Sequence, residues 1–104
     1  MFARKHRFSF KEGLPKRTKS FPSFNLRYGK NELGKARVAA VVSKRVHKHA
    51  TARNAIKRRF LAHLEERLNK NRGLDLVFYI KKKALDVANL ADEVESAVDF
   101  LEEI

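Results

Sequence analysis

More than any other segment, the stretch HKHATARNAIKRRF, residues 47–60, limits the folds that this chain can adopt. It is crowded with Lys and Arg and holds no acid, and charges at this density repel one another. Yet Ala52, Ile56 and Phe60 recur at every fourth position, the spacing of one face of an α-helix. The pattern therefore predicts a helix that buries one side in a core and presents cations on the other.

We expect this helix to cover roughly residues 52–70, because NRG at Asn71–Gly73 is a helix stop signal. Thr51 is the expected N-cap. The apolar stripe consists of Ala52, Ile56, Phe60, Leu64 and Leu68.

Charge is divided unevenly along the chain. The net charge is +12, from 24 Lys and Arg residues against 12 acids, and residues 84–104 hold seven of the acids with no Lys or Arg. Such a basic field destabilises a compact fold and indicates a polyanionic partner. Nucleic acid is favoured over a membrane surface, because a lipid-binding segment is expected to set bulky apolar residues against its basic face.

Three short segments have the pattern of β-strands. Residues 24–28 alternate apolar and polar side chains, while residues 37–43 and 74–80 are β-branched or apolar runs of interior strands. The turn-rich link 29–35 is predicted to be a hairpin connection. A second helix, near residues 90–103, places Leu, Val and Ala on one face and acids on the other, with Asn89 as a candidate cap.

These elements predict a small α+β domain that covers residues 1–104. Its first 20 residues form a basic and aromatic segment that could be flexible, since Gly13 and Pro15 break any long helix. The absence of cysteine excludes disulfides and thiolate metal sites. No apolar run approaches the ~20 residues that span a bilayer, and we expect a cytoplasmic protein.

The residues alone point to nucleic-acid binding rather than catalysis. Neither a carboxylate pair nor a Ser/His/Asp arrangement is evident, so no catalytic residue is assigned. His47 and His49 have no third ligand nearby, which favours phosphate contact or plain exposure over a metal site. The candidate RNA-binding residues are Lys44, Arg45, Lys48, Arg53, Asn54, Lys57, Arg58 and Arg59. The plain alternative is a solvated helix end without a partner.

Two neighbouring motifs resemble the protein subunit of bacterial ribonuclease P. That family has a strand ending in V-S-K-K/R and a helix opening with R-N-R-I-K-R, and here VVSKRV (Val41–Val46) precedes ARNAIKRRF (Ala52–Phe60). The resemblance extends from about Phe24 to the C-terminus. Ala55 stands where the family has the second Arg of its R-N-R triplet, and the family's first helix is not evident in the N-terminal segment.

The resemblance implies a central, mostly antiparallel sheet, a basic helix in a βαβ crossover and a C-terminal helix. It also implies an accessory subunit of an endonuclease that removes the 5′ leader of precursor tRNA. In that enzyme the catalytic groups belong to the RNA, which binds Mg²⁺, while the protein holds none alone. The implied partners are ribonuclease P RNA and precursor tRNA, and a protein oligomer is not required.

The resemblance further implies a cleft for the single-stranded leader. Phe8 and Phe10, among cations of the N-terminal segment, and Arg27 and Tyr28, on the first expected strand, are the candidates. Aromatic rings can stack on any base while cations follow the phosphates; alternatively, each Phe belongs to the core. Two other functions remain open at this point: a structural RNA-binding protein of ribosomal type, and a stand-alone nuclease.

Overall fold

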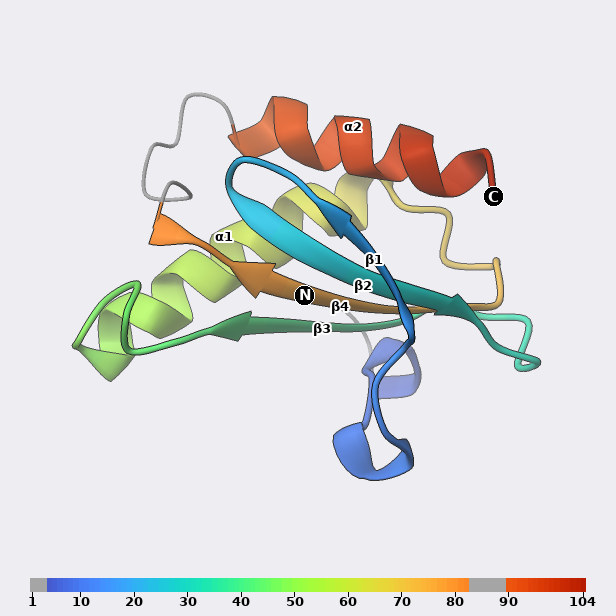
Figure 1. Cartoon of the computed structure of the whole chain (residues 1–104), viewed down its shortest axis with the longest axis horizontal. Coiled ribbons are helices and arrows are strands. Elements are labelled where there is room, and N and C mark those ends of the chain that lie inside the picture. The colour runs from blue at the N-terminus through green and yellow to red at the C-terminus, as the bar shows by residue number, and fades with distance from the viewer. Residues whose placement is uncertain (1–3, 83–89) are drawn as a thin grey trace.

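The protein is described by a computed structural model that covers residues 4–82 and 90–104 (Figure 1). Two 3-10 turns, η1 and η2, precede a sheet of four strands and two α-helices. Their bounds are η1 Arg4–His6, η2 Phe10–Glu12, β1 Arg17–Ser20, β2 Phe24–Lys30, β3 Arg37–Val42, α1 Ala50–Arg67, β4 Leu74–Ile80 and α2 Leu90–Glu102. Within these ranges no helix is long and apolar enough to cross a membrane.

The sheet has the strand order β1-β2-β4-β3. β2 pairs antiparallel with β1 and β4, whereas β3 pairs parallel with β4. A parallel pair needs a long crossover connection, and α1 supplies it. The mostly antiparallel sheet with a basic helix in a βαβ crossover is thus confirmed.

The predicted hairpin connection at residues 29–35 is wrong. β4 lies between β2 and β3, so the link joins two strands that are not neighbours. The physical reason is burial: five of the seven residues of β4 are buried, including Val77 on the face away from the helices. The most apolar strand takes a central place, and this displaces β3 to the edge.

Aromatic contacts hold α1 against the sheet. Phe60 of α1 packs its ring 5.2 Å from that of Phe24 on β2 and 4.9 Å from that of Phe78 on β4. All three side chains are fully buried. Leu64 continues this face of the helix, and five residues of α2 complete the core: Leu90, Val94, Ala97, Val98 and Leu101.

The ends of the helices differ in part from expectation. α1 begins at Ala50, and His49 rather than Thr51 is the N-cap; its carbonyl accepts the Arg53 N–H at 3.0 Å, but its side chain makes no capping bond. The helix ends at Arg67, because Leu68 turns to an extended conformation that leads toward β4. α2 agrees with its predicted range, and the predicted cap Asn89 lies outside the described residues.

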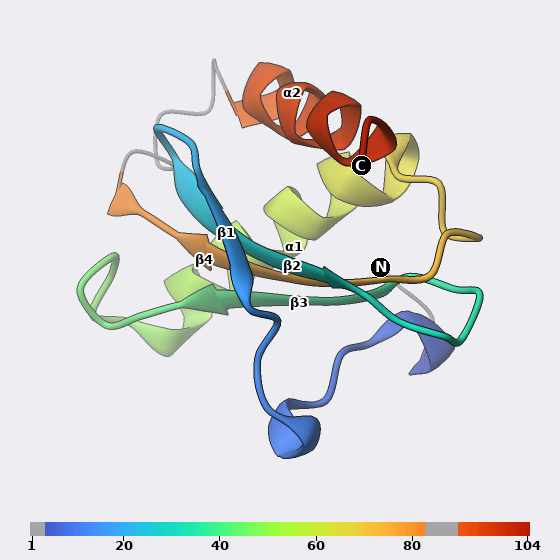
Figure 2. The ribbon, with the colours of Figure 1, turned by 45° about the vertical axis from the view of Figure 1, so that its right-hand side comes forward.

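The N-terminal segment lies beyond β3, on the side away from α2 (Figure 2). His6 is buried and its Nδ1 donates to the Ala36 carbonyl at 2.8 Å. The Phe8 N–H donates to the Val38 carbonyl at 3.0 Å. The segment ends in β1, which the sequence analysis did not predict because all four of its side chains are exposed and show no alternation. A backbone ladder to β2 forms this edge strand.

Replacing Gly73 with Ala should lower the free energy of unfolding by about 1–3 kcal/mol. The new Cβ would stand 2.7 Å from the backbone oxygen of Asn31 and 2.9 Å from its Oδ1. Asn31 cannot withdraw easily, because its N–H donates to the Gly73 carbonyl and its Oδ1 accepts the Leu33 N–H, each at 2.9 Å. Urea denaturation measures the loss.

Gly29→Ala is the matched control for this substitution. Its Cβ would make only an ordinary contact, 3.5 Å from Cβ of Pro15. We expect this variant to be at least as stable as the unmodified protein. Equal losses at both positions would contradict the steric explanation.

Candidate nucleic-acid interface

The outer side of α1 is a rigid basic surface. Ile56, Phe60, Leu61 and Leu64 anchor the helix in the core. On the opposite side Asn54, Arg58 and Arg59 are exposed, while Arg53 and Lys57 are half-buried. The first turn contains no acid, so the positive end of the helix dipole adds to the cationic field. This surface can bind phosphates through Arg forks and Lys point charges.

Arg53 holds the loop that precedes α1. Its Nη1 donates to the carbonyls of His47 at 3.0 Å and Lys48 at 2.9 Å. Buried Val46 ties the loop to the core, and its N–H donates to the Ser43 carbonyl at 3.0 Å. The loop therefore presents its exposed cations beside those of the helix: Lys44, Arg45 and Lys48. Arg53 acts through this loop as a positioning residue.

The two histidines of the loop lie close together. The ring centroids of His47 and His49 are 5.4 Å apart, and Nδ1 of His47 accepts the His49 N–H at 3.1 Å. In the part of the chain that the structure describes, no three His, Cys, Asp or Glu side chains gather as a metal site would require.

The four residues nominated for a leader cleft occupy different environments. Phe8 is buried, whereas Phe10 is 49% exposed, and the two rings meet edge to face at 5.4 Å. Tyr28 faces the core and packs edge to face on Phe100 at 5.3 Å. Arg27 lies on the other face of the sheet, where its Nε donates to the Pro15 carbonyl at 3.0 Å. Adjacent residues of one strand thus point to opposite faces.

A groove of about 460 Å³ lies between residues 13–17 and the sheet. It brings together Phe8 and Tyr28 but not Phe10 or Arg27. The sequence analysis missed the residues that add charge to this groove: Lys16, Arg17, Lys30, Arg37 and Asp75. A further basin of about 530 Å³ places Tyr79 beside Asn25 and Arg27 on the outer face of the sheet.

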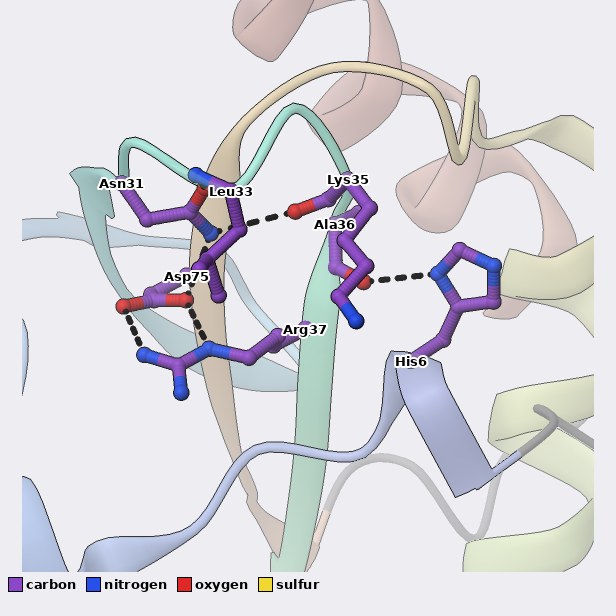
Figure 3. Close-up of polar contacts among 7 residues, drawn as sticks. All are labelled: His6, Asn31, Leu33, Lys35, Ala36, Arg37 and Asp75. Atoms are coloured by element: carbon purple, nitrogen blue, oxygen red, sulfur yellow. Dashed lines mark hydrogen bonds and ion pairs between the residues drawn. The ribbon is translucent and has the colours of Figure 1, made fainter.

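Two lining residues of the groove, Arg37 and Asp75, form an ion pair (Figure 3). Nε and Nη2 of Arg37 donate to Oδ1 and Oδ2 of Asp75, each at 2.8 Å, and Nδ2 of Asn31 donates to Oδ1 at 2.8 Å. Burial raises the pKa of Asp75, but the bonds from Arg37 and Asn31 and the charge of Arg37 outweigh it and keep the pKa below its ordinary value. The carboxylate therefore stays charged at neutral pH and holds β3 to β4.

Register explains why this pair was missed. Arg37 and Asp75 are Cα partners in the parallel ladder of β3 and β4. They are 38 positions apart in the chain, and no local pattern indicates the alignment of two strands joined by a helix. The Arg37 guanidinium also lies 5.4 Å from the ring centroid of Phe8, which fixes that ring at the groove.

Comparisons with known proteins agree with one another. Residues 4–102 match the sequence profile of the family described as Ribonuclease P, and no curated protein matches the chain. The chain is similar to the RNase P protein from Thermotoga maritima, at 21% identity over 85% of this chain and 83% of that one, with a TM-score of 0.63. A Staphylococcus aureus RNase P protein, a mutant with defective mRNA degradation activity, is 19% identical over 83% and 75%, with a TM-score of 0.69. At sequence identities this low, the two structures establish only the fold that this chain shares with them.

Replacing Arg53 with Ala should loosen the loop before α1. Loss of the bonds to His47 and Lys48 should speed hydrogen exchange of the loop amides by about tenfold, equivalent to about 1.4 kcal/mol. Amides in the middle of α1 should be unaffected. The control is Arg58→Ala, which removes an exposed Arg from the same helix. If both variants left loop exchange unchanged, the positioning role of Arg53 would be refuted.

Proposed function

Because the chain belongs to the Ribonuclease P family as a protein subunit of that enzyme, we propose that α1 and the preceding loop bind the enzyme's RNA. The observation that carries this proposal is the rigid basic surface of α1, which is anchored by Phe60 and holds its loop through Arg53. Rigid presentation lowers the entropy cost of binding. The family removes the reason to prefer a ribosomal-type protein or a stand-alone nuclease.

On this surface each side chain has a distinct task. Arg58 and Arg59 contact phosphates, and Asn54 offers a donor and an acceptor to a 2′-hydroxyl. Lys44, Arg45 and Lys48 extend the contact along the loop that Arg53 positions. Ala55, where the resembling motif has an Arg, contributes no charge, and neighbouring Arg59 supplies a cation on the same exposed side.

We further propose that the groove beside residues 13–17 holds the 5′ leader of precursor tRNA. Phe8 and Tyr28 line it, and Lys16, Arg17 and Lys30 supply cations. Such a combination suits single strands, because cations follow the phosphates while apolar surface receives the bases. Phe10 and Arg27 do not line it, but Phe10 packs on Phe8 and Arg27 donates to the Pro15 carbonyl. The chain then adds affinity for the substrate to an enzyme whose hydrolytic step belongs to the RNA.

Magnesium, which the family implies, does not fit the residues of this groove. Both oxygens of Asp75 already accept hydrogen bonds from Arg37, and Oδ1 also accepts one from Asn31. Mg²⁺ prefers carboxylate oxygens and water in octahedral geometry. We therefore assign the ion to the RNA partner. A cytoplasmic location and action without a protein oligomer complete the proposal.

Replacing Arg58 with Ala should weaken binding to ribonuclease P RNA and reduce its salt dependence. Each lost phosphate contact lowers the slope of log affinity against log salt by about 0.7–0.9 units. Circular dichroism should stay native, because the side chain is exposed. Arg67→Ala removes the same charge from the far end of α1 and should change the slope less. Equal slopes for Arg58→Ala and the unmodified protein would rule out this contact.

The gain in substrate affinity from the protein should depend on leader length. A precursor tRNA with several leader nucleotides should bind more tightly when the protein joins the RNA, since each stacked base contributes roughly 1–3 kcal/mol. A substrate with one leader nucleotide should gain little. Equilibrium binding of both substrates measures the difference.

Variants separate the groove from general charge in this experiment. Arg17→Ala, which lines the groove, should shrink the gain for the long leader, whereas exposed Lys82→Ala, which lies outside it, should not. Equal gains for both leader lengths with the unmodified protein would remove the leader-binding role.

A further inference from the structure

A second cleft, of about 270 Å³, lies between the N-terminal segment and α1 at the edge of the sheet. We call it the junction cleft; it is lined by Arg7, Phe8, Phe10, Val38, Ala39, Ala40, Lys57 and Leu61. Phe8 is its single lining residue in common with the groove proposed for the leader. The junction cleft therefore joins the RNA-binding helix to the segment that carries the two N-terminal Phe rings.

The apolar wall of the junction cleft is an aromatic ring held at the surface. Phe10 is 49% exposed, yet its ring packs edge to face on that of Phe8 at an interplanar angle of 87°. Phe8 is itself fixed by burial and by the bond from its N–H to Val38. Two small residues of β3, Ala39 and Ala40, also line the cleft. The exposed part of the Phe10 ring is the surface on which a flat aromatic partner would stack.

The polar groups of the junction cleft come from the outer edge of β3. β3 is the last strand of the sheet, and Arg7 bridges to it at Val38, whose carbonyl faces outward to accept the Phe8 N–H. Backbone groups of a strand alternate in direction, so Ala40, two residues on, also directs its N–H and C=O outward. Among residues 4–82 and 90–104 no backbone group pairs with Ala40 on that side. One donor and one acceptor thus face the cleft.

Positive charge completes the junction cleft. Lys57 is half-buried on α1, and Arg7 is exposed on the opposite wall. None of the described residues that line the cleft is an acid, and the charges of Lys57 and Arg7 would attract a phosphate there. The volume lies just below the ~300–1,000 Å³ of sites for drug-sized ligands, which suits one base and its phosphate.

We propose that the junction cleft binds a single unstacked RNA nucleotide. The base stacks on Phe10 and meets the backbone edge of Ala40, while the phosphate lies near Lys57 and Arg7. This inference rests on the proposed function and deepens it, because a nucleotide held here is gripped by both RNA-contacting parts of the protein. The nucleotide comes either from the enzyme's RNA or from the leader, and the chemistry of recognition is the same for both.

The first test uses adenosine 5′-monophosphate as a probe of the isolated protein. Titration followed by NMR should shift the Ala40 amide and the Phe10 ring resonances most strongly. Phe10→Ala should weaken binding roughly five- to hundredfold, the range that stacking of a base on an aromatic ring supplies. Lys57→Ala should weaken the binding of adenosine 5′-monophosphate more than the binding of adenosine, because only adenosine 5′-monophosphate carries a phosphate.

Matched controls separate stacking from general effects. Leu33→Ala removes another exposed apolar side chain, one that lines neither the groove nor the junction cleft, and this variant should bind the probe normally. Phe10→Leu keeps an apolar side chain without a ring and should behave like Phe10→Ala. If inorganic phosphate alone reproduced the shifts, or if Phe10→Ala and Leu33→Ala bound the probe equally, the proposal would be overturned.

The second test identifies the source of the nucleotide in the complete enzyme. Weaker binding of Phe10→Ala to ribonuclease P RNA without substrate would assign the nucleotide to that RNA. If Phe10→Ala instead reduced only the gain in affinity for the precursor tRNA with the long leader, the nucleotide would be assigned to precursor tRNA. Either result supports the proposal that the junction cleft binds a nucleotide. If neither quantity changed, the cleft would have no role in the enzyme. The probe titration needs no RNA, so its result can be separated from a failure of the proposed function itself.

Discussion

The contact of Phe60 with Phe24 and Phe78 is the interaction on which the rest of the molecule depends. It joins the crossover helix to two strands of the sheet, at centroid distances of 5.2 and 4.9 Å. Together with buried Ile56, Leu61 and Leu64, it holds in place a helix whose neighbouring cations repel one another. The basic side of α1 can therefore be exposed on a stable helix only because the opposite side is buried in the core.

The electrostatic repulsion on the basic side of α1 is limited by the way in which its charges are distributed. Arg58 and Arg59 are exposed to water, where repulsion is screened, and Arg53 turns inward to bind two loop carbonyls. Arg37, on the sheet, is neutralised by Asp75. Many exposed cations lie on α1, its loop and the borders of the two clefts, which are the places where a polyanion would lie, while others such as Lys82 lie elsewhere.

The N-terminal segment has a similar dependence on a few contacts. His6 and Phe8 bind backbone carbonyls at the start of β3, and Arg27 binds the carbonyl of Pro15. These bonds place the segment so that one flank borders the groove and the other borders the junction cleft. A segment with little secondary structure of its own thereby borders two clefts, because β2, β3 and Ala36 just before β3 supply its hydrogen-bond partners.

The elements with a strong apolar period were determined by the sequence itself. The interior strands, the basic crossover helix and the C-terminal helix follow from side chains that must leave water, and the exposed side of α1 follows from the same spacing. Tertiary structure alone decided the rest. The order of the strands, the exposed edge strand β1 and the pairing of Arg37 with Asp75 depend on ladders between distant segments, which leave no local trace. It also decided that Phe8 is buried while Phe10 is exposed, and that Tyr28 and Arg27 face opposite sides of one strand. Two similar rings in one basic segment look alike in sequence, and only the edge of β3 distinguishes them, because it binds the backbone of one and leaves the other at the surface.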